Sequence, residues 1–355
     1  MTEESTPVAD GASPERGRGA FSYKAVYVAF FGLLFCAGVV ALVMYWKLLY
    51  YERVAAFHLP EDMTFAARVD VEQAVMFEPV RKHLFPLVNE LAVRDPNLKP
   101  RSKRIEQHTR VDFAVDLREV IVARGRSPSD WLVGFGGLFP KDIVGGLQQV
   151  FVEEGYSPQV GPSGRMFILE NGLAVGQAED GCIFIAATGA RLEAALPRRV
   201  TSGRLLLARE GAAGFAVAGD FVGGLADAPV VAAVRELRGI KSAQGEVKLG
   251  NPLQITGQIE FLEGGDPART EKELSTLAEA LRKFLAGQPE VDLAGERRVL
   301  AQAKPSVISS GNVVLLAPWE RADVDRGAEN LARALRAWVN EPKVGGNSSG
   351  VTAPP

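Results

Sequence analysis

Side chains that commonly carry catalytic chemistry are scarce in this sequence. Its 355 residues include two cysteines and three histidines. The histidines, His58, His83 and His108, share no ligand spacing with one another or with a cysteine. H-E-x-x-H and paired C-x-x-C motifs are both missing. The sequence therefore predicts no metal site. The three imidazoles are expected to be solvated or half-buried.

Signatures of nucleophilic catalysis and of cofactor binding are missing too. There is no G-x-S-x-G, and no serine has a lysine three residues later. Cys182 opens an apolar strand, where a buried thiol is expected rather than a reactive one. Gly134 to Gly137 precede a helix, but the third glycine of a nucleotide fingerprint would fall at Phe139. We interpret these glycines as sites of a bulge or close backbone packing, and we predict no catalytic residue and no cofactor.

An excess of charge or of cysteine is also lacking. The net charge of −3 gives no general attraction to nucleic acid, so no nucleic-acid partner is expected. Cys36 lies in an apolar run and Cys182 in a polar region, which excludes an intrachain disulfide. Abundant alanine, glycine, valine and arginine with little lysine are typical of a GC-rich bacterial genome.

What the sequence does contain is one long apolar run, Ala25 to Trp46, without a charged residue or a histidine. As a helix, these 22 residues extend about 33 Å, enough to cross a bilayer. A cleavable signal peptide would have a shorter apolar core followed by small residues, and a buried helix would rarely be apolar on every face. We therefore predict a retained transmembrane helix.

Aromatic and basic residues gather at both ends of this run, as expected for side chains at the level of lipid headgroups. The predicted membrane-interface residues are Tyr23, Lys24, Tyr27, Tyr45, Trp46, Lys47, Tyr50 and Tyr51. Three basic residues precede the span (Arg16, Arg18 and Lys24) and two follow it (Lys47 and Arg53), which favours a cytoplasmic N-terminus. The C-terminal domain is then extracytoplasmic, or periplasmic. Alanines spaced by four would let two such helices pack closely, so a homodimer through the span is an alternative.

Composition and pattern divide the chain into six parts. We predict a disordered cytoplasmic head (1–24), the transmembrane helix (25–46), a stalk (47–58), a first α+β repeat (59–200), a second α+β repeat (201–341) and a disordered tail (342–355).

Weak self-similarity is the basis for the two repeats. Six residues recur at a constant offset of 150: Phe65, Ala66, Asp70, Pro79, Val80 and Leu87 match Phe215, Ala216, Asp220, Pro229, Val230 and Leu237. Four more recur at an offset of 127: Glu119, Val120, Pro140 and Leu147 match Glu246, Val247, Pro267 and Leu274. The first repeat thus carries an insertion, at about 93–116.

Each repeat is predicted to be β-α-β-β-α-β, a ferredoxin-like or split βαβ layout, with extra antiparallel strands and a closing helix. A mostly antiparallel sheet with helices on one face satisfies both the strand alternation and the helix stripes. The predicted elements include a strand at 298–303 and a final helix at 324–339 that buries Leu331, Leu335 and Trp338. Whether the two repeats share one sheet is left open.

The insertion is basic. Its candidate contact residues are Lys99, Arg101, Lys103, Arg104 and Arg110. Such a surface would suit anionic headgroups, another envelope component or an acidic protein partner, and the alternative is a solvated helix.

The leading functional hypothesis is a single-pass membrane-anchored bacterial envelope protein whose ectodomain binds or scaffolds without catalysis. The alternatives are a membrane-tethered hydrolase with no recognisable motif and a cytoplasm-facing tethered regulator. Convergence of Asp112, Asp116, Glu119 or His108 in one cleft would favour the hydrolase. Asp70 and Asp220 recur at strand ends, where a cap or turn role is expected.

Overall fold

The computed structural model describes residues 51–87, 90, 98–161, 163–199, 205, 207, 211–221, 240–262, 266–286, 294–308 and 312–340. Chain contacts separate residues 1–50 from residues 51–355, so every described residue belongs to the second unit. No helix within these described ranges is apolar and long enough to span a bilayer. The predicted head, transmembrane helix and tail lie outside them and stay predictions, as do the domain boundaries.

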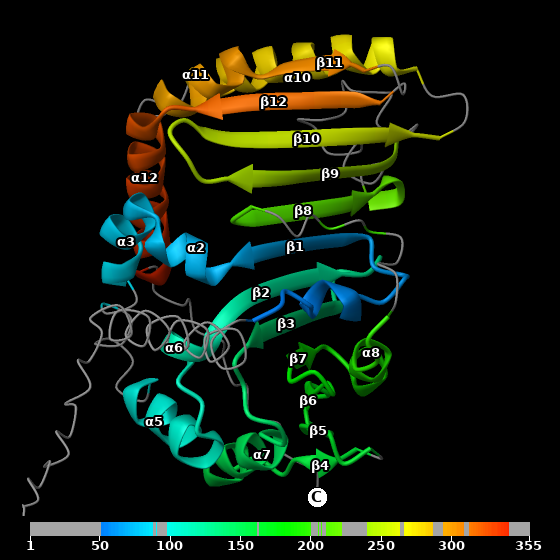
Figure 1. Ribbon diagram of the computed structural model, residues 1–355, viewed down its shortest axis with the longest axis vertical. Coiled ribbons are helices and arrows are strands. Elements are labelled where there is room, and N and C mark those ends of the chain that lie inside the picture. Colours follow the sequence, from blue (N-terminus) through cyan, green and yellow to red (C-terminus); the bar gives the residue numbers. More distant parts are fainter. Residues whose placement is uncertain are drawn as a thin grey trace, which may run out of the picture. The chain divides into compact units, whose positions relative to one another are not determined.

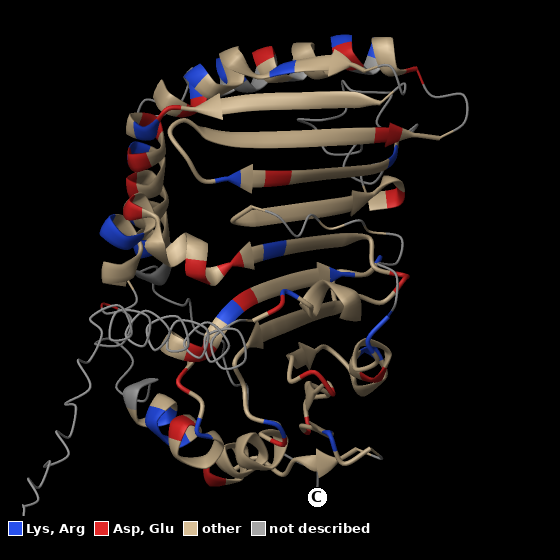
Figure 2. Ribbon diagram, in the orientation of Figure 1, with Lys and Arg blue, Asp and Glu red and all other residues tan. Residues whose placement is uncertain are grey.

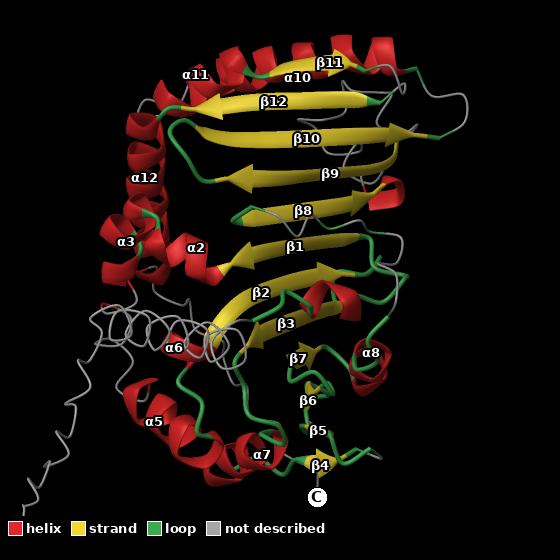
Figure 3. Ribbon diagram, viewed as in Figure 1, coloured by secondary structure: helices red, strands yellow, loops and turns green. Residues whose placement is uncertain are grey.

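The described elements come in runs of helices and runs of strands along the chain (Figures 1 and 3). The helices are η2 (Ala55–His58), α2 (Val71–Met76), α3 (Glu78–His83), α5 (Leu98–Thr109), α6 (Phe113–Asp116), α7 (Val144–Glu153), α8 (Gly189–Ala195), α10 (Pro267–Ala286), α11 (Ala294–Gln302) and α12 (Arg321–Asn340). The strands are β1 (Phe65–Asp70), β2 (Leu117–Arg124), β3 (Trp131–Gly137), β4 (Gln159–Val160), β5 (Met166–Ile168), β6 (Ala174–Gln177), β7 (Ile183–Ala186), β8 (Ala213–Ala218), β9 (Ile240–Lys248), β10 (Leu253–Phe261), β11 (Lys304–Val307) and β12 (Val313–Trp319).

These strands form one 12-stranded sheet in the order β11-β12-β10-β9-β8-β1-β2-β3-β7-β6-β5-β4. Every pair of neighbours is antiparallel. The predicted α+β class with a mostly antiparallel sheet is confirmed. The sheet also continues across the boundary between the two predicted repeats, because β1 pairs with β8 through Ala66 and Ala216 (Figure 1).

The split βαβ topology is wrong. In that layout the two strands joined by the first helix are parallel, and a third strand lies between them. Here the chain leaves β1, passes through helices and returns as β2, the antiparallel neighbour of β1, with Val69 opposite Val120. The order of elements along the chain is compatible with both topologies, so periodicity could not separate them.

Two further elements differ from prediction. The segment expected as a strand at 298–303 forms part of α11, a nine-residue helix. The final helix exists as α12, but Leu331 and Leu335 are exposed, whereas Val324 and Ala332 are buried. The side chain of Trp338 is not among those described.

Two apolar cores lie on opposite faces of the first half of the sheet. Successive residues of β7 alternate between them, since Phe184 belongs to one core and Ile183 and Ile185 pack in the other. The first core also contains residues of the chain preceding β1 and of α8. The second contains Val144 and Leu147 on the inner face of α7.

The chain immediately before β1 is part of the first core. We call residues 51–62 the N-terminal segment. Residues 51–54 have no regular secondary structure and η2 follows. Val54, Ala55 and Leu59 are buried, and η2 contacts β2 and β3. The predicted stalk therefore differs from the structure from residue 51 onward, because its small apolar side chains pack on a sheet that only the folded chain supplies.

The basic insertion forms α5, which packs against α7. Arg101 Nε and Arg104 Nη2 donate to Glu154 Oε1 at 2.6 and 3.0 Å. Partial burial of Glu154 opposes ionisation, but the hydrogen bonds from Arg101 and Arg104 outweigh it and lower the pKa of this carboxyl. Two of the five basic residues therefore hold α5 on α7.

Neutralising this carboxyl should loosen α5. We expect Glu154→Gln to speed amide hydrogen exchange in α5 roughly fivefold, equivalent to about 1 kcal/mol for a partly exposed charged pair. Because the folded pKa of Glu154 is depressed below 4.5, the native chain should retain this contribution above that pH and lose it as the pH falls through the lowered value. Exchange of the exposed Glu106→Gln variant should match that of the native chain.

Candidate functional site

A chain of polar side chains lies between the N-terminal segment and the sheet. It is drawn from the N-terminal segment, from β1 and β2, and from the turn between β6 and β7. We call it the buried polar network, and its members are Tyr51, Arg53, His58, Arg68, Asp70, Glu119, Asp180 and Cys182.

The centre of the network is an ion pair between neighbouring strands. Arg68 on β1 and Glu119 on β2 are both fully buried, with Arg68 Nε 3.3 Å from Glu119 Oε1. Arg68 Nη2 also donates to the carbonyl of Gly211 at 3.1 Å. Burial raises the pKa of Glu119, and the charge of Arg68 opposes that shift. Burial lowers the pKa of Arg68, although a guanidinium keeps its proton in proteins.

The second oxygen of Glu119 binds the N-terminal segment. The Tyr51 hydroxyl and the Ala55 amide both donate to Glu119 Oε2 at 3.2 Å. Burial, with the nearby Cys182 and Glu119, raises the pKa of Tyr51, so its hydroxyl stays protonated and remains a donor. One carboxylate thus joins the sheet to the segment that packs on it.

A glycine of β3 makes room for this contact. A Cβ at Gly136 would lie 2.0 Å from the Tyr51 hydroxyl oxygen and 3.1 Å from Glu119 Oε2. The pairing of β2 with β3 also shifts register near Glu119. The sequence-based interpretation of the Gly134 to Gly137 stretch, a bulge with close packing, is confirmed.

Arg53 forms a second link to β1. Its guanidinium donates to Asp70 Oδ2 at the end of the strand. The other oxygen of Asp70 accepts the Gln73 amide at 2.9 Å and so caps α2, which confirms the cap predicted for Asp70. Asp220 accepts the amide of Phe221 at 3.1 Å.

His58 carries the network to the β6–β7 turn. Its Nδ1 lies 2.9 Å from the Ala195 carbonyl oxygen, and its Nε2 lies 2.8 Å from Asp180 Oδ2. The ring is fully buried against Phe184, so the expectation of a solvated or half-buried imidazole is wrong for this histidine. Asp180 is partly buried, which opposes ionisation, but the hydrogen bond and charge of His58 outweigh burial and lower the pKa of Asp180.

Cys182 closes the chain of contacts. Its amide donates to Asp180 Oδ1 at 3.2 Å, and its Sγ lies 3.5 Å from the Tyr51 hydroxyl oxygen. Burial, followed by the charge of Asp180, raises the pKa of this thiol. The predicted buried, protonated cysteine is confirmed.

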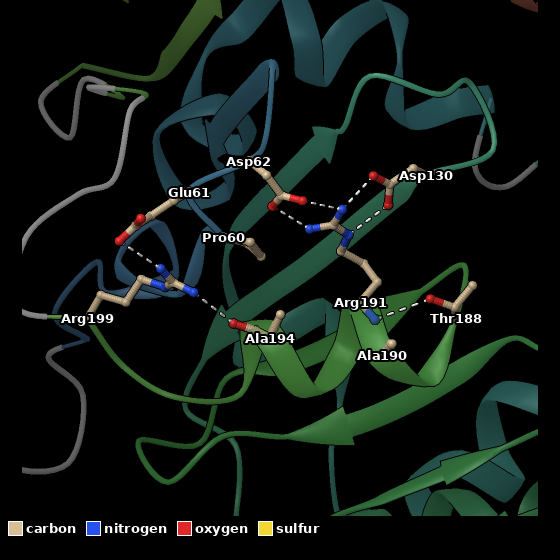
Figure 4. A pocket seen from close by; sticks show the side chains of 9 residues that line it. All are labelled: Pro60, Glu61, Asp62, Asp130, Thr188, Ala190, Arg191, Ala194 and Arg199. Atoms are coloured by element: carbon tan, nitrogen blue, oxygen red, sulfur yellow. Dashed lines mark hydrogen bonds and ion pairs between the residues drawn. The ribbon is translucent and has the colours of Figure 1, made fainter.

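A separate group of ion pairs holds the other end of the N-terminal segment. Arg191 of α8 donates to Asp62 at 2.7 and 2.9 Å and to Asp130 at 2.7 Å (Figure 4). Arg199 lies 3.3 Å from Glu61. These groups line a cavity of about 440 Å³, and the charged side chains drawn there point toward one another rather than toward an open site.

The acidic residues considered for a hydrolase do not converge. Asp112 caps α6 through the Ala114 amide, and Asp116 accepts the Asp112 amide. His108 lies 2.9 Å from Glu153. Of these four residues only Glu119 is buried, and its carboxylate is paired with Arg68. These contacts give each group a structural role.

The remaining predicted site residues fall into two groups. Tyr51 lies in the buried polar network, which differs from its predicted place at a membrane surface. Seven predicted interface residues lie outside the described ranges: Tyr23, Lys24, Tyr27, Tyr45, Trp46, Lys47 and Tyr50. Of the basic contact residues, Arg101 and Arg104 pair with Glu154, Lys103 and Arg110 are exposed, and the side chain of Lys99 is not described.

Comparison with known proteins yields little likeness. No protein-family model and no curated protein matches the sequence. The solved structures that the chain is similar to include three crystal forms of TP0453. Crystal form III has a TM-score of 0.40 at 10% identity over 81% of this chain and 99% of TP0453. Form I gives 0.37 at 11% over 80% and 98%, and form IV gives 0.36 at 9% over 82% and 99%. Likeness at this level carries no functional conclusion.

The buried ion pair should show strong coupling. Arg68→Met and Glu119→Gln should each lower the free energy of unfolding by about 3–5 kcal/mol, because each leaves one buried charge without its counterion. The double variant should lose much less than the sum, since the amide oxygen of the glutamine introduced by Glu119→Gln can still accept from Tyr51 and Ala55. Chemical denaturation of the four proteins measures this cycle.

The exposed pair Glu329–Arg333 on α12 is the matched control, and its coupling should stay near 0.5 kcal/mol. The pH dependence gives a second readout. The pKa of Glu119 is already raised, and Arg68→Met removes the charge that opposes this shift. A raised carboxyl pKa favours the fold at low pH and loses that contribution as the pH rises, so Arg68→Met should be more destabilising at pH 8 than at pH 5. Additive losses would contradict the assigned pairing.

Two glycine substitutions should distinguish the effect of close packing on stability from the effect of helix propensity. We expect Gly136→Ala to lower stability by about 1–3 kcal/mol, because the new methyl group displaces Tyr51 from Glu119. Gly145→Ala in α7 meets no atom within 4 Å and should be neutral or stabilising by up to about 1 kcal/mol. Thermal unfolding compares the two, and equal losses would show that Gly136 makes no special contact.

Proposed function

We propose that this chain is a single-pass membrane-anchored bacterial envelope protein whose C-terminal domain binds or scaffolds other components without catalysis. The N-terminus is cytoplasmic and the domain is extracytoplasmic. The proposal rests on one observation about the N-terminal segment. The chain that follows the apolar run in sequence is held in the core of the domain by a network of buried charges.

The network supports this proposal through its position in the sequence. Only residues 47–50 separate the apolar run from Tyr51, the first residue of the buried polar network. Arg53, His58 and Asp62 then make successive ion-pair contacts with three different parts of the domain. Such contacts attach the domain firmly to the membrane helix, because the N-terminal segment cannot detach from the sheet without separating buried ion pairs.

An internal duplication is part of the proposal. The local pairing of β1 with β8 supports it, since Ala66 lies opposite Ala216, its match at offset 150, and Ala67 lies opposite Phe215. This is the pattern of a local two-fold axis. The strand registers then place Ala218 at the position equivalent to Arg68, and, continued to position 220, they place Ile240 at the position equivalent to Glu119. They do not align Glu119 with Glu246, its sequence match at an offset of 127.

This comparison of the halves also bears on function. Ala218 and Ile240 are buried apolar residues at the positions where the first half has a buried ion pair. Sheet architecture alone therefore does not require the charges. They occur in the half that binds the N-terminal segment, which supports a role in holding that segment.

The basic insertion remains a proposed contact surface for an anionic headgroup, envelope polymer or acidic protein. Arg101, Lys103 and Arg110 are its exposed described members. Arg101 and Arg104 hold α5 in place through Glu154, so their contribution to a partner would be shared with this packing role. A homodimer through the apolar run is a further proposal.

The anchor and its orientation can be tested together. The full chain should remain in the membrane pellet after alkaline extraction and retain its N-terminal residues on mass spectrometry. Leu34→Arg with Val40→Arg should release it to the soluble fraction, because two arginines at the centre of a span oppose insertion by about 5–7 kcal/mol together. A reporter that is active only outside the cytoplasm, fused after Val339, should be active.

The matched control is Leu34→Val with Val40→Leu, which keeps the hydropathy and should keep the protein in the pellet. A second fusion carries a reporter that is active only in the cytoplasm. Activity of that reporter alone would reverse the proposed orientation and favour the tethered regulator. Release of the native chain by alkali would exclude the anchor itself.

A further inference from the structure

Three chemically different ligand groups meet at one end of the buried polar network. His58 offers an imidazole nitrogen, Asp180 a carboxylate oxygen and Cys182 a sulfur, and these atoms lie within 4.8 Å of one another. His58 and Cys182 are buried and Asp180 is partly exposed. Imidazole, thiolate and carboxylate are the side chains that bind Zn²⁺ in proteins.

The orientation of His58 is that of a metal ligand. The Ala195 carbonyl can only accept a hydrogen bond, so Nδ1, at 2.9 Å, carries a proton. Nε2 then faces the other two groups, and a backbone carbonyl at the distal nitrogen is the usual partner of a metal-bound histidine. Since Asp180 Oδ2 is also an acceptor, its 2.8 Å separation from Nε2 requires a positive charge between the two atoms. A proton or a metal ion can supply that charge.

The distances allow the second possibility after the ligand atoms rearrange, since separations of up to 4.8 Å would have to shorten. In a tetrahedral zinc site, bond lengths of about 2.0–2.3 Å place neighbouring ligand atoms about 3.3–3.6 Å apart. The Nε2 to Oδ2 distance of 2.8 Å would therefore lengthen by about half an ångström. A cavity of about 800 Å³ lined by His58, Asp180, Ser163 and Arg165 gives an ion and a water ligand access from solvent.

We propose that His58 Nε2, Asp180 and the Cys182 thiolate form a divalent metal site of zinc type, with water as the fourth ligand. The metal replaces the proton between His58 and Asp180 and the proton of the Cys182 thiol, so up to two protons are released. The Tyr51 hydroxyl lies 3.5 Å from Sγ, and its single hydrogen is donated to Glu119 Oε2. Residues 122 positions apart would be joined by one ion, which would reinforce the attachment of the N-terminal segment to the β6–β7 turn.

Cobalt spectroscopy tests the site directly. The full chain carrying Cys36→Ser, purified in detergent without a histidine tag and stripped with a chelator, contains Cys182 as its single cysteine. Titration with Co²⁺ should produce tetrahedral d–d bands and a thiolate-to-cobalt charge-transfer band that saturate at one equivalent. One equivalent of Zn²⁺ should abolish both. The lack of a thiolate band would overturn the proposal without any substitution at the site.

Variants then assign the other ligands. His58→Gln and Asp180→Asn should each weaken Co²⁺ binding at least tenfold, whereas His83→Gln and His108→Gln should leave it unchanged. Circular dichroism checks that each variant is folded, and if the His58 variant is not, the tetrahedral band intensity of the Cys36→Ser protein decides the geometry. Equal weakening by the control histidines would show adventitious surface binding and contradict the site.

Discussion

The pairing of Arg68 with Glu119 is the constraint on which the first half of this structure depends. Two charges lie fully buried on adjacent strands, and their desolvation is opposed by their mutual attraction and by donors from the N-terminal segment. Removal of the segment would take the Tyr51 and Ala55 donors away from Glu119. The N-terminal segment and the sheet are therefore coupled, since each stabilises the folded conformation of the other.

The arrangement of charge follows from this coupling. Figure 2 shows charged residues on helices and loops, on β1 and β2 in the middle of the sheet, and also on β9 and β10. On the opposite face, α5 and α7 cover the second apolar core and are joined through Glu154. The two faces thus use ion pairs differently. One pair is buried and specifies a single docking position, and the other is partly exposed and adds a modest contribution to helix packing.

Periodicity was sufficient for much of the secondary structure because burial on one face leaves a local signal. It predicted a mostly antiparallel α+β arrangement and a final helix at 324–339, which exists as α12. It failed for the second half of α11, since residues 298–303 were expected as a strand, and for Leu331 and Leu335, whose exposure depends on what packs beside α12. Strand neighbours were inaccessible, since the same order of elements fits more than one order of strands in an antiparallel sheet.

The buried polar network left little trace in the sequence. Arg68 lies on the same face of β1 as Ala66 and Asp70. Because this face carries both apolar and charged residues, alternation alone does not show whether it faces the core or the solvent. Its partner Glu119 was noticed only as one of several scattered acids. His58 and Cys182 had no common spacing because they lie far apart along the chain, and only the fold brings Asp180 and Tyr51 between them.

The sequence alone determined that residues 25–46 are long and apolar enough for a bilayer, that the rest of the chain is a mixed α+β domain, and that no local catalytic motif is present. These properties are carried by neighbouring residues, so composition and period report them. The tertiary structure decided that β1 and β8 join the halves in one antiparallel sheet and that residues 51–62 belong to its core. It also decided which charges meet, because burial and pairing arise between residues far apart in the chain.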